Sequence, residues 1–277
     1  MNSSTSDFPR PFRASQAQAI LPRSASLALW IARVGSGAHS AEEAVASVQH
    51  IDEPHIIDDA SGSIPLVTFL RACVGRVVAS AAAFPIPGDI ASAPYLATYD
   101  GVEAEELVLL RLRAQDNSTY SIALVPQISE FGPAGDRGYI TRWHRIDIEP
   151  WELQFLASAG SLPEAQRALR IGLAKATEAL VDLDVARWHD DHADLIDLLR
   201  DSVNVEDFLP PDVSTRVYSI IESAARLRAI VDLARFTDGA ALGAAQASAR
   251  LRLLRDVDSI ARRAMEAATL LSPLLPD

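Results

Sequence analysis

The chain has 277 residues, of which 49% are hydrophobic and 22% charged, so it is long enough for one or two hydrophobic cores and is not disordered throughout. Acidic residues outnumber basic ones by 37 to 25, which gives a formal net charge of −12. This excess of negative charge argues against a surface built mainly to neutralise phosphates, so nucleic acid is not an expected partner.

The single cysteine, Cys73, cannot form an intramolecular disulfide. This favours a reducing compartment and predicts a cytoplasmic protein. The first residues lack the apolar segment of a secretory signal. The longest apolar stretch, residues 64–90, is interrupted by Arg71, Arg76, Pro85 and Pro87, whereas a membrane-spanning helix needs about 20 apolar residues in a row. We therefore expect no membrane association.

The N-terminal part begins with a segment that has no hydrophobic period. Residues 1–23 are rich in serine, threonine and proline and are predicted to form a flexible arm. The spacing of Leu27, Ile31 and Val34 then predicts a short helix that ends at a pair of glycines. Ser40 and Glu43 form a capping-box pattern, which predicts the start of a second helix over residues 41–49.

Two segments follow whose patterns differ. Residues 52–63 are acidic and rich in turn formers, so we expect a loop there. From Ile64 to Phe84 the apolar residues return to helical spacing, which predicts one continuous helix with Cys73 on its apolar stripe. Two prolines directly after Phe84 end this predicted helix.

The period changes to two in the middle of the chain. Alternating apolar and polar residues at 107–113 and around 120–125, separated by a polar turn, predict a β-hairpin. The aromatic and β-branched residues of 138–147 predict a third antiparallel strand. A sheet of three strands needs a helix on its apolar face, and the helix predicted over 64–84 is the nearest candidate.

From residue 150 onwards every pattern is helical, and Ser161 with Glu164 forms a second capping box. The fold class expected is therefore α+β and predominantly helical, with N-terminal helices, a small antiparallel sheet and a C-terminal antiparallel helical bundle. We divide the chain into a flexible arm (1–23), an α/β domain with a three-stranded antiparallel sheet (24–149) and a helical bundle (150–277). The helices predicted after residue 150 cover 151–159, 161–183, 185–201, 214–236 and 241–271.

The sharpest chemical pattern is a cluster of carboxylates at Asp190, Asp191 and Asp194, on a predicted helix. Residues three or four apart lie on one face of a helix, and carboxylates gathered there can bind Mg²⁺ for a diphosphate substrate. The spacing resembles the aspartate-rich helix of isoprenoid-diphosphate enzymes. However, the chain shows no second metal-binding helix of the kind these enzymes have, and a solvated acidic helix face explains the cluster equally simply.

Three other groups have a chemical interpretation and a structural one. His50, Asp52, His55, Asp58 and Asp59 have residue types that ligate transition metals, but they also suit a polar surface loop. Cys73 lies on an apolar stripe, where cysteine is usually an inert core residue. Arg10, Arg13 and Arg23, near Phe8 and Phe12, and the arginines of the last predicted helix could contact nucleic acid. Those of the last helix could instead pair with acidic residues, mainly of the helix predicted over 185–201.

Three segments, residues 19–34, 52–55 and 84–89, together with the helical C-terminus rich in alanine and arginine, resemble a family of actinobacterial hypothetical proteins. The resemblance extends over most of the chain. It implies a protein from a GC-rich genome and a cytosolic setting, and it implies no activity, cofactor or catalytic residue.

Because the motifs of common enzyme classes are not found, we expect a non-enzymatic cytoplasmic protein that interacts with other proteins or regulates them. The long apolar helix faces favour association with a protein partner or self-association as a homodimer. No cofactor is expected. The alternative function is a divalent-metal-dependent enzyme that acts on a phosphorylated or diphosphate substrate, with Mg²⁺ bound at Asp190, Asp191 and Asp194.

Calorimetry with Mg²⁺ or Mn²⁺ separates these two functions. For the interaction protein we expect no heat of binding that differs between the wild type and Asp191→Ala, because a solvated carboxylate face does not hold a specific ion. Heat of binding that the wild type shows and Asp191→Ala lacks would instead support the metal-dependent enzyme.

Overall fold

The computed structural model describes residues 21–49, 54–133, 137–182, 205–236 and 244–271. The described residues form an α+β fold built on one mixed sheet of six strands in the order β2-β1-β6-β5-β4-β3. All neighbouring strands are antiparallel except β1 and β6, which run parallel. The strands are β1 (His55–Asp59), β2 (Gly62–Pro65), β3 (Val77–Ala83), β4 (Leu107–Arg113), β5 (Thr119–Phe131) and β6 (Gly138–Ile148).

The predicted hairpin and third strand are confirmed as β4, β5 and β6. The turn between β4 and β5 closes where Ser118 donates both its backbone N–H and its hydroxyl to Asp116, and Asn117 adopts the left-handed conformation that asparagine tolerates. The expected size of the sheet is wrong, because three more strands extend it at both edges. The segment 52–63, expected as a loop, contains β1 and the start of β2.

The single helix expected over residues 64–84 is also wrong. The segment forms the end of β2, then the helix α3 (Leu66–Cys73), and then the strand β3. The helix stops at Gly75, which has a φ of +70° and donates its N–H to the carbonyl of Gly35. After this turn the small apolar residues of β3 pair with β4, so tertiary pairing overrides the helical spacing.

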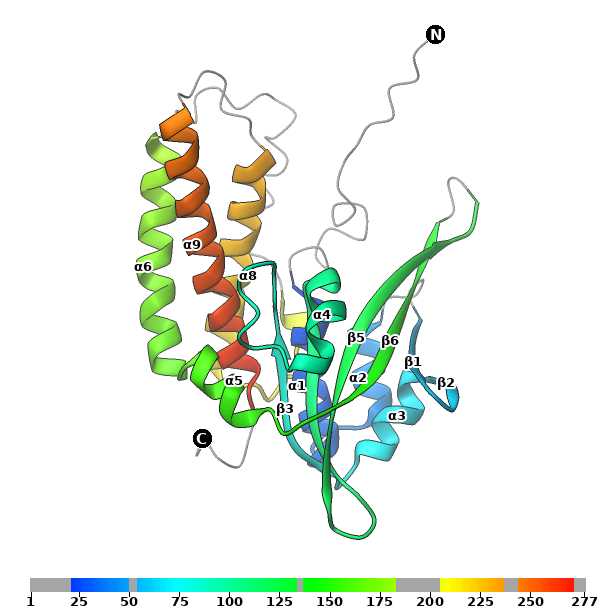
Figure 1. Ribbon diagram of the computed structural model, residues 1–277. Helices are drawn as coiled ribbons and strands as arrows, with labels where there is room; N and C mark the ends of the chain where they lie inside the picture. Colours follow the sequence, from blue (N-terminus) through cyan, green and yellow to red (C-terminus); the bar gives the residue numbers. More distant parts are fainter. Residues whose placement is uncertain (1–20, 50–53, 134–136, 183–204, 237–243, 272–277) are drawn as a thin grey trace.

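Three helices cover one face of the sheet: α1 (Arg23–Gly35), α2 (Ala41–Val48) and α3. Figure 1 shows them behind the strands. The predicted capping box is present at α2, where the Ser40 hydroxyl accepts from the Glu43 N–H and the Glu43 carboxylate accepts from the Ser40 N–H. On this face the Ser80 hydroxyl of β3 donates to the carbonyl of Ala28 in α1. Only Leu21 and Pro22 of the predicted arm precede α1 in the described residues, and Leu21 is buried.

The opposite face of the sheet is covered by shorter elements, the 3-10 turn η2 (Tyr95–Ala97) and α4 (Thr98–Ala104), and α5 (Glu152–Ala159) packs against the long helix α9. In Figure 1, α4 lies in front of the strands. The approach is close, because a Cβ atom on Gly101 would lie 2.4 Å from Cδ2 of Leu107. Position 101 therefore requires glycine for packing.

Three long helices lie beside the edge strand β3 (Figure 1), and they are α6 (Leu162–Asp182), α8 (Thr215–Phe236) and α9 (Ala244–Thr269). Together with α5 they confirm four of the helices predicted after residue 150, whereas the one predicted over 185–201 lies outside the described residues. At the end of α9, Leu271 exchanges two backbone hydrogen bonds with Ser80 of β3, at 2.8 and 2.9 Å. None of the described helices is both long enough and apolar enough to span a membrane.

A buried polar network joins α9 to the loop that follows β3. Arg262 of α9 donates to the Asp89 carboxylate at 2.8 Å, to the carbonyl of Phe84 at 2.9 Å and to Asp258 at 3.1 Å. Arg263 donates to the other oxygen of Asp89 at 2.8 Å. Arg262 and Asp258 are buried, whereas Asp89 and Arg263 are partly exposed, and each charge has a partner of opposite sign, which is the condition for keeping an ion inside a protein.

Glu266 lies in the same network and is only 2% exposed. Its Oε1 atom accepts from the backbone N–H of Phe84 at 3.0 Å and from the hydroxyl of Ser92 at 2.6 Å. Burial raises the pKa of Glu266, and these hydrogen bonds and the two nearby arginines oppose the rise only in part. For Asp89, burial acts in the same upward direction, but the contacts with Arg262 and Arg263 outweigh it and lower its pKa.

The raised pKa of Glu266 predicts a specific dependence of stability on pH. A carboxyl group that holds its proton more tightly when folded adds stability below its unfolded pKa and loses that contribution as the pH rises through its folded pKa. Glu266→Gln stays neutral and keeps an acceptor oxygen. We therefore expect its free energy of unfolding to fall less than that of the wild type as the pH rises. Urea unfolding of both proteins between pH 4 and pH 8 measures the difference.

Glu266→Ala is the matched comparison, because it removes the acceptor and leaves two buried donors without a partner. We expect it to lower the free energy of unfolding by about 3–5 kcal/mol, against about 1 kcal/mol or less for Glu266→Gln. Equal losses in the two variants, or an unchanged pH dependence in Glu266→Gln, would contradict this assignment.

Candidate functional site

The two predicted metal clusters have different outcomes. Asp190, Asp191 and Asp194 lie outside the described residues, so the Mg²⁺ site stays a prediction. His50 and Asp52 also lie outside them, whereas His55, Asp58 and Asp59 lie in β1. Among the residues that the structure describes, no three histidine, cysteine or acidic side chains are grouped as a metal site would require.

The three residues in β1 have structural partners. His55 is buried and accepts a hydrogen bond at 3.3 Å from the Trp143 indole of β6. Hydrogen bonds from Ser63 and Arg142 lower the pKa of Asp58, and the Arg142 contact measures 3.2 Å. Asp59 accepts from the backbone N–H of Ser61 and so closes the turn between β1 and β2. From His55 onwards, the segment that was expected to be a polar loop therefore forms a strand pair.

Cys73 is a core residue, as predicted. It lies buried in α3, and burial raises the pKa of its thiol to about 12, which the charge of Arg76 opposes only slightly. Because the thiolate is the reactive form of cysteine, such a group is a poor nucleophile at neutral pH.

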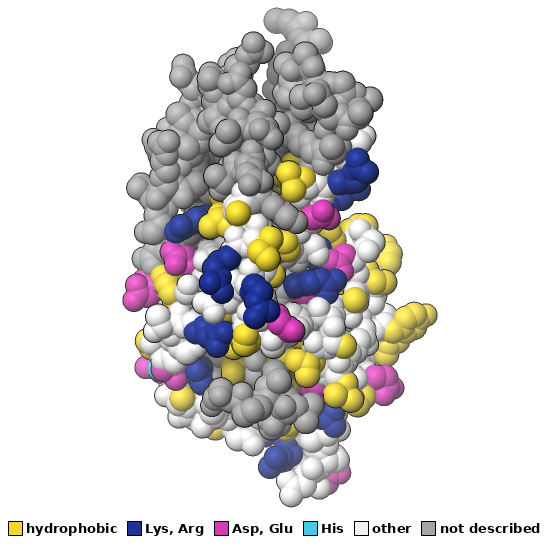
Figure 2. Space-filling view, turned by 90° about the vertical axis from the view of Figure 1, so that its left-hand side faces the viewer, with side chains coloured by type: hydrophobic (Ala, Val, Ile, Leu, Met, Phe, Trp, Pro, Cys, Tyr) yellow, Lys and Arg dark blue, Asp and Glu magenta, His cyan; other side chains and the backbone are white. Residues whose placement is uncertain are grey.

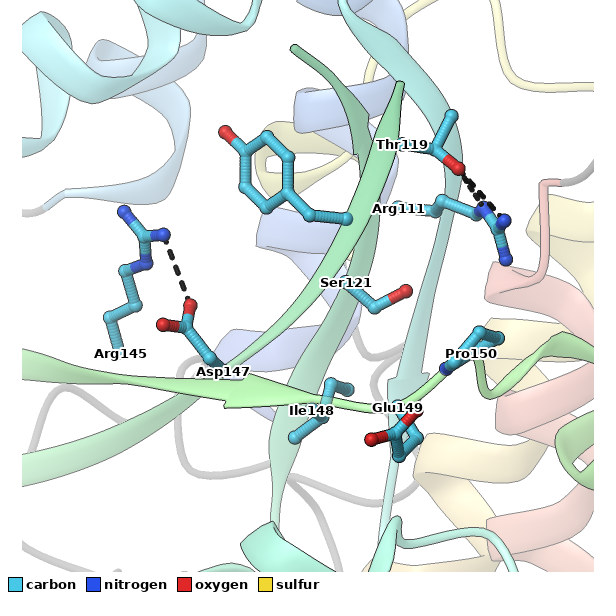
Figure 3. A pocket seen from close by; sticks show the side chains of 9 residues that line it. Arg111, Thr119, Ser121, Arg145, Asp147, Ile148, Glu149 and Pro150 are labelled. Carbon is cyan, nitrogen blue, oxygen red and sulfur yellow. Dashed lines mark hydrogen bonds and ion pairs between the residues drawn. The ribbon is translucent and has the colours of Figure 1, made fainter.

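A hollow of about 530 Å³ opens where β6 leaves the sheet. The last pair between β5 and β6 joins Ser121 to Ile148, so Thr119 and Tyr120 continue β5 beyond its partner and pair with β4 alone. Figure 3 shows Arg111 and Thr119 on one side of the hollow, Arg145 and Asp147 on the other, and Ser121 between them.

Both arginines in this hollow are already paired. Arg111 donates to Glu152 at 3.2 Å and to Thr119 at 2.8 Å, and Arg145 donates to Asp147 at 3.1 Å. The Ser121 hydroxyl is 5% exposed and has no hydrogen-bond partner among the described residues. Since none of the residues described as lining the hollow is a histidine or cysteine, nothing there activates Ser121 as a nucleophile. The hollow is a weak candidate for chemistry.

The most distinctive surface of the described molecule is formed by η2 and α4. Tyr95 is 91% exposed and Tyr99 80% exposed, and Leu96 between them is also exposed. Asp100 and Glu103 are exposed beside them. Tyr99 and Glu103 are four residues apart in α4 and so lie on one side of that helix, and Tyr95 lies in η2, directly before it. We call the surface formed by Tyr95, Leu96, Tyr99, Asp100 and Glu103 the tyrosine face.

Small residues on the inner side of the helix explain why the tyrosines point outward. Ala97 and Gly101 are buried against the sheet, where Leu107 fills the space beneath Gly101. The Thr98 hydroxyl donates to the carbonyl of Pro94 at 2.9 Å and holds the start of the helix. With small side chains facing the sheet, the large aromatic ones project into solvent, and Figure 2 shows hydrophobic side chains protruding at the edge that corresponds to the front of Figure 1.

The tyrosine face lies in a strongly acidic part of the chain. Residues 77–110 contain no lysine or arginine, but they contain Asp89 and four carboxylates between positions 100 and 106. Glu106 accepts from the backbone N–H of Ser24 at 2.9 Å and from its hydroxyl at 2.7 Å, so it caps the N-terminus of α1. Glu105, at the end of α4, has a φ of +58°, a conformation in which an ordinary side chain is strained.

A second charged surface covers the long helices. Figure 2 shows lysine or arginine side chains gathered on the side formed by these helices. The exposed arginines of α6 and α9 include Arg167, Arg170, Arg252 and Arg255. Exposed carboxylates of Glu164 and Asp256 lie among them in the same two helices. Since the signs are mixed, this surface does not form a continuous basic stripe of the kind that follows a phosphate backbone.

Two family models match the chain. The model of the N-terminal domain of Rv1486c-like proteins covers residues 24–155, and that of the C-terminal domain covers residues 163–266. The chain belongs to the Rv1486c-like family. This confirms the predicted resemblance to an actinobacterial family of hypothetical proteins. The tyrosine face and the hollow both lie within the first match, and the arginines that bind Asp89 lie within the second. No curated protein and no solved structure matches the chain.

The sequence analysis did not single out Tyr95 and Tyr99. The available signal was a pair of tyrosines four residues apart, between Pro94 and Gly101, in a stretch without basic residues. That pattern alone does not tell which side of the helix meets the sheet. The contact between Gly101 and Leu107 decides this, and it is a tertiary contact.

The strain at Glu105 gives a test of the local structure. Replacing Glu105 with glycine removes the steric cost of the left-handed conformation, so we expect the free energy of unfolding to rise by about 1 kcal/mol. Asn117→Gly is the control, because asparagine tolerates a φ of +69° and the gain there should be smaller. Urea unfolding measures both variants, and a loss of stability in Glu105→Gly would contradict the assigned backbone conformation.

Proposed function

We propose that the protein is a non-enzymatic interaction protein that binds a partner through the tyrosine face. The observation that supports this most directly is the exposure of Tyr95 and Tyr99, at 91% and 80%, on the consecutive elements η2 and α4, of which α4 packs closely on the sheet. Large apolar side chains that project together from a folded surface often mark sites of protein interaction.

Tyrosine is well suited to this role. Its ring supplies a large contact area, and it has few rotatable bonds to restrict on binding. Tyrosine is also among the residues that contribute most to binding energy at interfaces. Because Gly101 holds α4 tightly against Leu107, the two rings are presented from a rigid backbone, which lowers the entropy lost on binding.

The charges around the tyrosines indicate the chemistry of the partner. Asp100 and Glu103 are exposed beside the rings, and residues 77–110 contain no basic side chain that would neutralise them. A complementary partner therefore carries arginine or lysine next to aromatic residues or prolines. Arginine can pair with a carboxylate and also lie over a tyrosine ring, as Arg145 does over Tyr120 at 5.7 Å in this protein.

We also propose that the protein is cytoplasmic and that its C-terminal part, from residue 150, is an antiparallel helical bundle. The single buried cysteine supports the first proposal. The side-by-side packing of α6, α8 and α9 supports the second, including the close approach of Gly172 in α6 to Leu227 and Ile260. Homodimer formation is a further proposal, and it rests on the apolar helix faces of the sequence.

Fluorescence anisotropy with labelled synthetic peptides tests the tyrosine face. The probes are short peptides in which arginine and proline surround phenylalanine, compared with the same peptides carrying glutamate in place of arginine. We expect the arginine peptides to bind the wild type more tightly than the glutamate peptides. The double variant Tyr95→Ala/Tyr99→Ala should weaken this binding at least about tenfold, as loss of an interface hot spot does.

Phe131→Ala is the matched control, because Phe131 is an exposed aromatic residue on β5, outside the tyrosine face. It should leave the affinity unchanged. Binding that is insensitive to the tyrosine substitutions, or that is equal for the two sets of peptides, would contradict the proposed interaction site.

A further inference from the structure

We propose that residues 8–13 of this chain bind to its own tyrosine face and compete there with the partner. The inference rests on the proposed function and identifies a regulator of that site. Three observations support it: the chemistry of this segment, the point at which the N-terminal residues join the folded protein, and the complementary charges.

The segment has the side chains that the tyrosine face is suited to bind. Its sequence is Phe-Pro-Arg-Pro-Phe-Arg, so two aromatic rings, two prolines and two arginines occur within six residues. Proline favours the extended polyproline II conformation, which loses little entropy on binding and is commonly recognised by surfaces lined with aromatic side chains. Arg10 and Arg13 can pair with carboxylates while Phe8 and Phe12 pack against tyrosine rings.

The N-terminal residues join the folded protein close to the tyrosine face. The described chain begins at Leu21, and Ser24 is hydrogen-bonded to Glu106, which directly follows the end of α4. The ten residues of η2 and α4 together extend about 15–20 Å, at about 1.5–2.0 Å per residue. From Leu21 back to Phe12 the chain can extend about 30 Å, at about 3.3 Å per residue. Residues 8–13 can therefore reach all of the tyrosine face.

A tether this short makes intramolecular binding effective. The local concentration of a segment held by a short linker is on the order of millimolar, so an interaction that is weak between separate molecules still occupies the site. Asp7 is the only acidic residue among residues 1–20, so Arg10 and Arg13 give this stretch a net positive charge, opposite to that of Asp100 and Glu103. The attraction should weaken as salt is added, because exposed charges are screened.

A spin label on the full chain tests this contact directly. Ser15→Cys carries a nitroxide, whereas Cys73 is buried, has a thiol pKa raised to about 12 and does not take up the label. We expect the amide NMR signals of residues 95–103 to broaden relative to the same protein with the nitroxide reduced. Arg10→Glu/Arg13→Glu should remove the broadening, and so should Tyr95→Ala/Tyr99→Ala. Signals in 95–103 that do not broaden would overturn the proposal.

A mixed sample separates binding within one molecule from binding between two. Spin-labelled protein without ¹⁵N is mixed with ¹⁵N-labelled protein without the spin label. Broadening of residues 95–103 that occurs only when the nitroxide and ¹⁵N are in the same chain supports the intramolecular contact. Broadening of equal size in the mixed sample would mean that a second copy occupies the face, and it would overturn the proposal.

The competition is measured with the peptide probes described above. We expect Phe8→Ala/Phe12→Ala to bind the arginine peptides about tenfold more tightly than the wild type, because the competing segment no longer occupies the site. Equal affinity in the two proteins would overturn this inference while leaving the proposed function intact. If the peptides bind neither protein, the proposed function fails, and the broadening experiment still decides whether the segment contacts the face.

Discussion

The contact between Arg262 and Asp89 is the interaction on which the rest of the structure depends. Arg262 lies in α9, near the C-terminal end of the described chain, whereas Asp89 lies in the loop after β3, and their atoms are 2.8 Å apart. The same guanidinium donates to the carbonyl of Phe84, so it binds that loop at its start and near its middle. Buried charges of this kind are stable only with every partner in place, so the contact fixes one arrangement of helix and sheet.

This arrangement also positions the tyrosine face. Glu266 of α9 accepts from Phe84 and Ser92, and the Gln154 side chain of α5 donates to the carbonyls of Ala91 and Ala93. The loop that leads into η2 is therefore held by two helices that follow it in sequence by more than sixty residues. Because Tyr95 comes directly after this loop, the long C-terminal helices determine where the proposed interaction surface lies.

The features that sequence patterns predicted correctly are those determined locally. The capping box of Ser40 and Glu43, the turn around Asp116 and the helices after residue 150 depend on residues a few positions apart. The structure contains the first two, and four of the five predicted helices lie in its described residues. The incorrect predictions concern segments whose conformation is decided by distant partners. The small apolar residues of β3 suit a helix or a strand equally, and pairing with β4 decides between them.

The candidate site could be predicted only in part for the same reason. Acidic and histidine clusters have recognisable spacing, so they are the functional sites that the sequence predicted. Phe8, Phe12, Arg10 and Arg13 were interpreted only as contacts for nucleic acid. Nothing in the spacing of Tyr95 and Tyr99 reveals their exposure, which follows from the packing of Gly101 on Leu107. The acidic character of residues 77–110 is visible in the sequence. It indicates a binding surface for a cationic partner only once Tyr95 and Tyr99 are known to be exposed.

The charges of the tyrosine face also bear on self-association. In a dimer with two-fold symmetry the same patch meets itself, so a dimer formed through this face would bring Asp100 and Glu103 of one copy close to those of the other. Like charges at an interface oppose binding, and residues 77–110 provide no basic side chain to separate them. A homodimer of this protein would therefore form through another surface, such as the helices on which arginines and carboxylates alternate. The tyrosine face would remain open to a cationic segment, whether from a partner or from residues 8–13.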